Sequence, residues 1–449
     1  MSVKKTRNIK KIIVIITIII LTVIAVITSV GAYIVHDIQS KVKGKELVYI
    51  PQTSVIESKP ATPVDSSAGT PINMVLIGVD SRDGDKKNSL IGGNEKGNYN
   101  SDSIILLHIS ADRNDASVIS FPRDLIVNQP SCNLSNGKVF PARKDVMINS
   151  IMPAVFNQTH DKSSAASCLV NTLSSITKIG LRTFAIVDFA GLSDLIDSVG
   201  GVDICIPQPI VDSYTKLNLK QGFQHLDGIT ATQYARVRHG SDSDGSDLIR
   251  TVKQQYLIKE LFKKIKQQQT LSDISKIYSL TNTALNHMSL SSDLTNIATL
   301  TGLAYSMRHL SQNRIETMTI PTAPYVKDPN RVQFADNVNE IWNNILLDRS
   351  IYYKDNSDNK NNENSNSSDY LTDEQKKKFD KQYKTDESIH TAQNSFITDP
   401  DGKLIDVKTR GIIDKLSGVI KDAKTGAVIG INYDYVNTAC KALSSSLSN

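Results

Sequence analysis

The chain has 449 residues, of which 22% are charged and 39% are hydrophobic, and its formal net charge is +5. So small a charge on a chain of this length argues against a general nucleic-acid-binding protein, because such proteins concentrate basic residues on one face. The four cysteines form no C-x-x-C motif, which leaves zinc and thioredoxin-like redox sites without support.

The N-terminus has the pattern of a membrane anchor. Residues 1–11 carry five basic side chains and no acidic one, and residues 12–35 carry no charge and are rich in Ile and Val. This uncharged run exceeds the ~20 residues that cross a bilayer and is longer than the apolar core of a signal peptide. We therefore predict a single transmembrane helix with a cytoplasmic N-terminus and an extracytoplasmic remainder. A Ser-Val-Gly step at 29–31 leaves cleavage of the anchor open.

Composition divides the exported part into four segments. Residues 36–70 mix Lys, Pro, Ser and Thr without period and are interpreted as a stalk. Residues 71–346 are long enough for one large core and are predicted to be the main folded domain. Residues 347–390 contain sixteen consecutive polar residues and are predicted to be a linker. Residues 391–449 form an appendage whose role the sequence does not indicate.

Apolar runs in the domain at 71–346 alternate with segments of helical period. The runs at 72–79, 102–109 and 117–121 are typical of buried strands. Residues 184–206 have the pattern of a strand, a helix at about 190–198 and a second strand, which together favour a βαβ unit. Residues 248–265 have the period of a helix. We predict an α/β fold in which a central mixed sheet is flanked by helices.

Charged residues stand at the ends of three predicted strands, at Asp80, Asp102, Arg123 and Asp124. Open α/β sheets place ligand sites at strand ends. Carboxylates near a phosphate are the usual protein contribution to a Mg²⁺ site, so the cluster suggests phosphoryl transfer with Mg²⁺ as cofactor. The structural alternative is that Arg123 and Asp124 cap a turn and Asp80 merely ends a strand.

A second group of polar residues follows at 234–254. Arg236 and Arg238 stand two apart, so on a strand they point the same way. Arg250 and Gln254 stand four apart, so on a helix they share a face, with Asp247 one turn back. Because arginine binds phosphate in a bidentate manner, a pyrophosphate between the two segments is one interpretation. Solvated salt bridges on two surfaces are the other.

The cysteines lie in the exported part, where disulfides persist. They are Cys132, Cys168, Cys205 and Cys440, and they allow three pairings. A bond between Cys132 and Cys168 is weakly favoured, while small buried thiols remain the alternative.

Eight short segments then occur in a specific order and spacing. They are Leu76-Ile-Gly-Val-Asp80-Ser-Arg82, Ser101-Asp102-Ser103, Ser120-Phe-Pro-Arg123-Asp124, Val187-Asp-Phe-Ala-Gly191, Leu195-Ile-Asp-Ser-Val-Gly-Gly-Val202, Leu226-Asp-Gly228, Tyr234-Ala-Arg236-Val-Arg238 and Asp247-x-x-Arg250-x-x-x-Gln254. This set resembles the LytR–CpsA–Psr (LCP) family of cell-wall ligases over residues 72–266, and more weakly to 346. The cysteine after Gly-Gly-Val, the second cysteine pair and the C-terminal block look like the actinobacterial branch.

The resemblance implies a membrane enzyme that moves a glycopolymer from a polyprenyl-pyrophosphate carrier to peptidoglycan and forms a phosphodiester. It assigns Mg²⁺ to Asp80 and Asp102, and it matches Asp124 to an acidic residue of the active site. Asp124, or a carboxylate near it, is our choice for the base. Asp247 matches the start of the last motif. The family also holds the lipid tail in an apolar channel. The pyrophosphate-binding positions, of which Arg123 and Arg238 are also expected to act in catalysis, are Arg123, Arg236, Arg238, Arg250 and Gln254.

Four positions depart from the family pattern. Asn100 and Lys253 stand where arginine is common, Met147 where lysine often precedes Ile-Asn, and Ile249 where glycine is usual. Since lysine acts as a point charge only, these changes predict a weakened rim around the anion site.

Two other functions remain open. A polyprenyl-pyrophosphate hydrolase uses the same site with water as the acceptor. A non-catalytic receptor for anionic cell-wall polymer needs only the arginines, although a cytoplasmic tail of eleven residues leaves little room for signalling.

Overall fold

The structure, a computed structural model, describes residues 47–52, 69–80, 99–241, 247–295, 297–353, 395–398, 402–423, 426 and 428–447. Among these residues no helix has both the length and the apolar character that crossing a membrane requires. The predicted transmembrane helix at 12–35, most of the stalk and the polar run of the linker lie outside the described residues and stay predictions.

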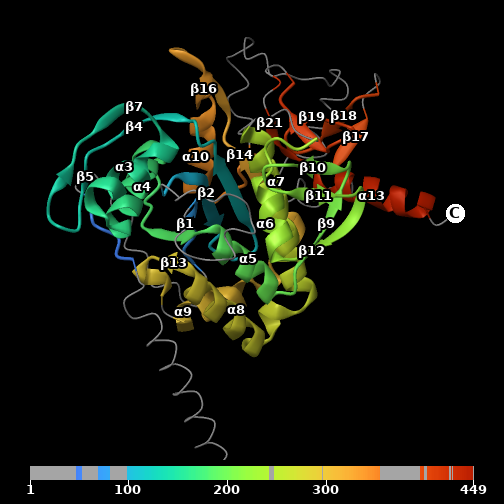
Figure 1. Cartoon of the computed structure of the whole chain (residues 1–449), viewed down its shortest axis with the longest axis horizontal. Coiled ribbons are helices and arrows are strands. Elements are labelled where there is room, and N and C mark those ends of the chain that lie inside the picture. Colours follow the sequence, from blue (N-terminus) through green and yellow to red (C-terminus); the bar gives the residue numbers. More distant parts are fainter. Residues whose placement is uncertain are drawn as a thin grey trace, which may run out of the picture. The chain divides into compact units, whose positions relative to one another are not determined.

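A six-stranded mixed sheet lies at the centre of the described fold, with the order β13-β8-β1-β2-β3-β14 (Figure 1). Its strands are β1 (Ile72–Val79), β2 (Ser101–Ile109), β3 (Ala116–Phe121), β8 (Thr183–Val187), β13 (Met288–Leu290) and β14 (Ile315–Thr319). The β1–β8 and β3–β14 pairs are parallel, and the other neighbours are antiparallel. The predicted α/β fold with a mixed sheet is confirmed.

The two faces of β1 and β2 have different surroundings. We call the face that carries Val75, Ile77 and Leu106 the packed face, because these side chains belong to one large core with α3 (Ile151–Thr159), α4 (Lys162–Thr177) and α10 (Val338–Leu346). We call the opposite face, with Leu76 and Ile105, the cavity face. Helices α7 (Asp247–Gln267) and α9 (Ile297–Ser306) cover part of it. Strand period 2 puts neighbouring residues of β1 on opposite faces.

The predicted βαβ unit is only partly formed. Helix α5 (Phe189–Ser198) follows β8 as expected, but β9 (Val202–Ile206) leaves the central sheet and pairs with β12 (Gly222–Leu226). Gly200 and Gly201 both have positive φ, 75° and 78°, and turn the chain between helix and strand. Hydrophobic pattern identifies such a strand without identifying its partner.

Arg236 is not on a strand. It is the last residue of helix α6 (Gly228–Arg236), and Arg238 follows one residue beyond the turn at Val237. The Asp227 side chain caps the helix by accepting a hydrogen bond from the Thr230 amide. Gly228 is required there because a Cβ would lie 2.0 Å from the Ser193 carbonyl oxygen.

The C-terminal block is a second sheet packed against the domain at 71–346. Its strands are β17 (Phe396–Thr398), β18 (Leu404–Asp406), β19 (Ile412–Ile413), β20 (Val419–Lys421) and β21 (Val428–Ile431), followed by α13 (Tyr433–Leu447). Helix α7 contacts both β14 and β21 (Figure 1). A disulfide joins Cys205 of β9 to Cys440 of α13, and the favoured bond between Cys132 and Cys168 is confirmed.

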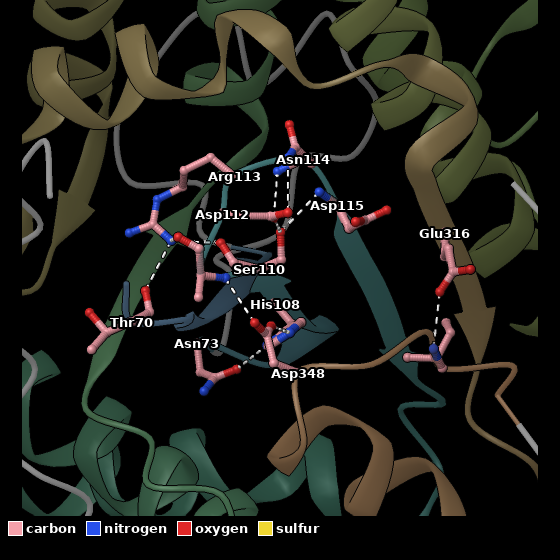
Figure 2. Close-up of polar contacts among 12 residues, drawn as sticks. Thr70, Asn73, His108, Ser110, Asp112, Arg113, Asn114, Asp115, Glu316 and Asp348 are labelled. Carbon is pink, nitrogen blue, oxygen red and sulfur yellow. Dashed lines mark hydrogen bonds and ion pairs between the residues drawn. The ribbon is translucent and has the colours of Figure 1, made fainter. Parts of the chain in front are cut away.

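A polar cluster fastens the ends of β1 and β2 that lie far from Asp80 and Asp102 (Figure 2). The ring nitrogens of buried His108 lie 2.8 Å from Asn73 Oδ1 and 2.9 Å from Asp348 Oδ1. The second oxygen of Asp348 accepts a hydrogen bond from the Ala111 amide. The chain directly after α10 is thereby tied to the sheet.

Further strands and one further helix are β4 (Ile126–Gln129), β5 (Cys132–Asn133), β6 (Val139–Phe140), β7 (Arg143–Met147), β10 (Ile210–Asp212), β11 (Leu217–Leu219), α8 (Ile274–His287), β15 (Thr322–Tyr325) and β16 (Asp328–Phe334).

Residues 47–52, within the predicted stalk, lie against the core: the Leu47 amide donates to the Leu290 carbonyl and the Ile50 amide to Ser167 Oγ.

Candidate active site

A cavity of about 760 Å³ lies on the cavity face, between β1, β2 and helices α5, α6 and α7. Of the eight residues predicted for the site, seven line it, and Asp124 does not. Gly78 and Ser103, which are paired across β1 and β2, form part of the floor.

Asp80 and Asp102 come from the adjoining ends of β1 and β2. The Val79–Ser101 pair closes the ladder, and the amides of Asp80 and Asp102 both donate to the Asn100 carbonyl. Two carboxylates on one wall suit Mg²⁺, which takes few protein carboxylates and completes its shell with water and phosphate. Among the described residues no group of three or more potential metal-binding side chains is found, so the fit rests on this pair.

Arg123 and Arg250 are held by one carboxylate, that of Asp247. Its Oδ1 lies 3.3 Å from Arg123 Nε and 2.9 Å from an Arg250 guanidinium nitrogen. Arg250 also donates to the Asp102 carbonyl at 2.6 Å, and Arg123 lies 3.4 Å from Asp102 Oδ1. Asp247 is only 12% exposed, so both ion pairs are largely shielded from water. Sequence analysis placed Asp247 one turn before Arg250 and assigned it no role in binding, yet Asp247 orients two of the predicted anion binders.

Arg238 is different, because no described residue forms an ion pair or hydrogen bond with its guanidinium. Burial lowers its pKa, and the charges of Arg123 and Arg250 lower it further. Asp247 and Asp102 act in the opposite direction but do not compensate. A desolvated guanidinium among like charges is stabilised by a bound anion.

Arg236 reaches the cavity from the C-terminal end of α6. Its guanidinium carbon lies 4.2 Å from the centroid of the Phe189 ring, at the start of α5, and Phe189 also lines the cavity. This cation–π contact fixes the direction of the side chain. Arg236 and Arg238 therefore meet in one cavity although they do not share a strand.

Gln254 is fixed at both ends of its amide. Its Nε2 donates to the Ala235 carbonyl at 3.1 Å, and its Oε1 accepts from Ser103 Oγ at 3.0 Å. Arg250 and Gln254 lie on the face of α7 that lines the cavity, as the i, i+4 spacing predicts. In this arrangement Gln254 connects α6, α7 and β2.

Asp124 lies beside the cavity and not on its wall. Burial raises the pKa of its carboxyl group, the charge of Asp247 adds to the rise, and Arg123 and Arg331 oppose it. Asp124 directly follows Arg123 in the chain, which brings it next to the arginine cluster.

Of the four positions that were predicted to weaken the rim of the anion site, only one lines the cavity. Asn100 lines the cavity, but Met147, Ile249 and Lys253 do not. Met147 pairs with Ile126 in the β4–β7 ladder, and Ile249 is part of a hydrophobic core. Lys253 is buried with its ammonium 6.0 Å from the Tyr234 ring centroid, on another side of α7. Helical period explains the difference, because consecutive residues point about 100° apart.

The deeper wall of the cavity is apolar. Its side chains come from the cavity face, α5, α7 and β13: Leu76, Ile105, Leu192, Leu195, Leu257, Ile258, Leu261 and Met288. The cavity thus combines a cluster of arginines and aspartates with a set of apolar side chains that suit a hydrocarbon.

Comparison with known proteins identifies the family of this chain. The model of the LytR_cpsA_psr family matches residues 35–346. The chain is 28% identical to the cell wall biosynthesis protein LcpA of Corynebacterium glutamicum over 221 residues, an alignment that covers 46% of this chain and 42% of LcpA. It is 27% identical to the probable cell wall biosynthesis protein LcpB of the same organism over 279 residues, an alignment that covers 60% of this chain and 58% of LcpB. The chain thus spans about half the length of these curated relatives.

A third relative is the polyisoprenyl-teichoic acid–peptidoglycan teichoic acid transferase TagU of Oceanobacillus iheyensis, 27% identical over 280 residues, 62% of this chain and 72% of TagU. Among solved structures, a LytR-Csp2A-Psr enzyme from Actinomyces oris has a TM-score of 0.46 at 20% identity and covers 68% of this chain and 97% of its own. Because the family model spans more than half of the sequence, the chain belongs to the LytR–CpsA–Psr family.

Proposed function

We propose that this chain is a membrane-anchored phosphotransferase that moves a glycopolymer from a polyprenyl-pyrophosphate carrier to peptidoglycan. The observation that carries the proposal is one cavity lined both by apolar side chains and by a cluster of arginines that includes Arg238, which has no ionic partner among the described residues. A lipid pyrophosphate has the matching division between a charged head and a hydrocarbon tail. Relatives named as cell-wall biosynthesis proteins and teichoic acid transferases support the same class.

The reaction follows from this placement of groups. A glycan hydroxyl attacks the phosphorus that carries the polymer, a new P–O bond forms, and the bond to the bridging oxygen of the pyrophosphate breaks. Polyprenyl phosphate leaves, and the proton of the hydroxyl passes to Asp124 or a carboxylate near it. Arg123, Arg238 and Arg250 offset the charge of the transferred phosphoryl group, and such preorganised donors contribute most of the catalysis in this kind of chemistry.

Asp80 and Asp102 would hold Mg²⁺ in this proposal. The ion supplies positive charge to the phosphate oxygens when bound. The predicted anchor at 12–35 would keep the cavity close to the bilayer surface, where the lipid carrier resides.

The test uses the purified full-length chain, a polyprenyl-pyrophosphate-linked glycan and peptidoglycan fragments. We expect polymer bound to the fragments, and Arg238→Ala should lower the rate about 10²–10³-fold because one preorganised donor is lost. The control is Arg308→Ala, which removes a partly buried arginine that is stacked on exposed Tyr305 and does not line the cavity.

Each rival function has its own outcome. Release of glycan phosphate that is independent of fragments would identify a hydrolase. Binding of anionic polymer with no turnover would identify a receptor. Wild-type transfer rates in Arg238→Ala would overturn the proposed site.

A further inference from the structure

The hairpin of β10 and β11 contributes to the cavity although neither the pyrophosphate chemistry nor the lipid wall uses it. Asp212, Tyr214 and Thr215 of this hairpin line the cavity together with His239, the residue after Arg238. These four side chains differ in chemistry from the arginine cluster, because they offer a carboxylate, two hydroxyls and two rings.

The hairpin is fixed to the segment that carries Arg238. The Ser241 amide donates to the Val211 carbonyl, the Val211 amide donates to Ser241 Oγ, and Ser241 Oγ donates to the Pro209 carbonyl at 2.8 Å. The Tyr214 amide donates to Asp212 Oδ1 at 2.9 Å and sets the turn. The distance between the hairpin and the arginine cluster is therefore defined by hydrogen bonds.

Thr215 shows that this wall is incomplete without a ligand. The residue is only 4% exposed, and its Oγ1 has no hydrogen-bond partner among the described residues. A buried hydroxyl without a partner costs about 1–3 kcal/mol, and native structures rarely keep one. Asp212 is also buried, and no described residue donates to its second carboxylate oxygen.

Tyr214 supplies a ring at the mouth of the same space. It is 74% exposed, and its ring centroid lies 4.9 Å from that of His239. A flat apolar face beside a buried carboxylate and an unpartnered hydroxyl is complementary to a pyranose, which has an apolar face of C–H groups and a rim of hydroxyls.

We infer that Asp212, Tyr214, Thr215 and His239 form a saccharide subsite that holds the sugar ring next to the pyrophosphate. Tyr214 packs against the face of the ring, and Thr215 and Asp212 bind its hydroxyls. The position of the subsite rests on the proposed function. The ring belongs either to the first sugar of the donor or to the acceptor glycan, and the same chemistry serves both.

The test measures the affinity of the full-length chain by calorimetry for three probes. They are farnesyl pyrophosphate, farnesyl pyrophosphate carrying N-acetylglucosamine, and a soluble disaccharide fragment of peptidoglycan. The variants are Tyr214→Ala, Tyr214→Phe and Thr215→Val. The control is Val211→Ala, on the same hairpin but away from the cavity and 54% exposed.

If the subsite holds the donor sugar, Tyr214→Ala should weaken binding of the sugar-bearing pyrophosphate about tenfold. Thr215→Val should weaken this binding by a similar factor. Affinity for farnesyl pyrophosphate should stay unchanged, and Tyr214→Phe and Val211→Ala should resemble the wild type. If only the disaccharide is weakened, the subsite holds the acceptor.

Equal affinity of wild type and variants for every probe would overturn the subsite, as would an equal loss for sugar-free and sugar-bearing pyrophosphates. Failure of the wild type to bind either pyrophosphate would instead refute the proposed function. Disaccharide binding by wild type and Tyr214→Ala then still decides the subsite: an equal affinity overturns it, and a weaker variant supports it.

Discussion

The two faces of β1 and β2 are built from alternate residues of the same strands, yet one is packed and the other is hollow. Val75 and Leu106 on the packed face have no exposed surface and meet α3, α4 and α10. Leu76, one residue from Val75, lines the cavity with Gly78 and Ser103. The difference teaches that β1 and β2 carry stability on one side and recognition on the other. Substitutions on the two faces should therefore have separable effects.

The largest expected effect is on the packed face. Leu106→Ala should lower the free energy of unfolding by about 2–5 kcal/mol, because it removes a fully buried side chain and leaves a cavity. Leu76→Ala is the matched change on the other face and should cost less, since the side chain borders existing space. Denaturant unfolding measures both, and equal losses would contradict the division between the faces.

Gly78→Ala should affect both properties at once. A Cβ at this position would lie 2.9 Å from Ser103 Cβ, so Ser103 must shift and its hydrogen bond to Gln254 weakens. We expect a loss of about 1–3 kcal/mol in unfolding free energy together with weaker pyrophosphate binding. Gly430→Ala is the control, because its Cβ would meet nothing closer than 3.8 Å. Unchanged pyrophosphate affinity in Gly78→Ala would argue against a role for Gln254.

Filling the cavity should change affinity more than stability. Leu76→Trp places a large ring against the apolar wall and should weaken binding of a long polyprenyl pyrophosphate about tenfold. Binding of inorganic pyrophosphate serves as the internal control and should remain. A competition assay compares the two ligands, and equal losses for both would mean that the apolar wall does not hold the tail.

The smallest expected effect is a shift in the pH at which activity falls on acidification. Burial, with the charge of Asp247, raises the pKa of Asp124, so its carboxyl stays protonated at pH values where an ordinary aspartate is ionised. A base must be deprotonated, and activity should therefore fall on acidification at a higher pH than for an ordinary aspartate. The pH profile of kcat/KM measures this limb, and Asp124→Asn should remove it. Persistence of the limb in that variant would assign it to another group.

Local signals in the sequence predicted much of this molecule. The run at 72–79 is strand β1, and the period at 248–265 lies within α7, because both patterns are set by one element against one core. The i, i+4 spacing of Arg250 and Gln254 correctly put them on one face. None of the C-terminal strands β17 to β21 was predicted, since runs of two to four residues carry too little pattern.

Other features depended on partners distant in the chain. The sequence determined which residues are charged, the fold class and the family, because these follow from composition, period and motif order. Only the tertiary structure decided that Asp247 orients Arg123 and Arg250 while Arg238 has no ionic partner in the described chain, and that Lys253 does not line the cavity. The physical reason is that ion pairing and burial depend on distances between side chains on separate elements, and no spacing within one element encodes those distances.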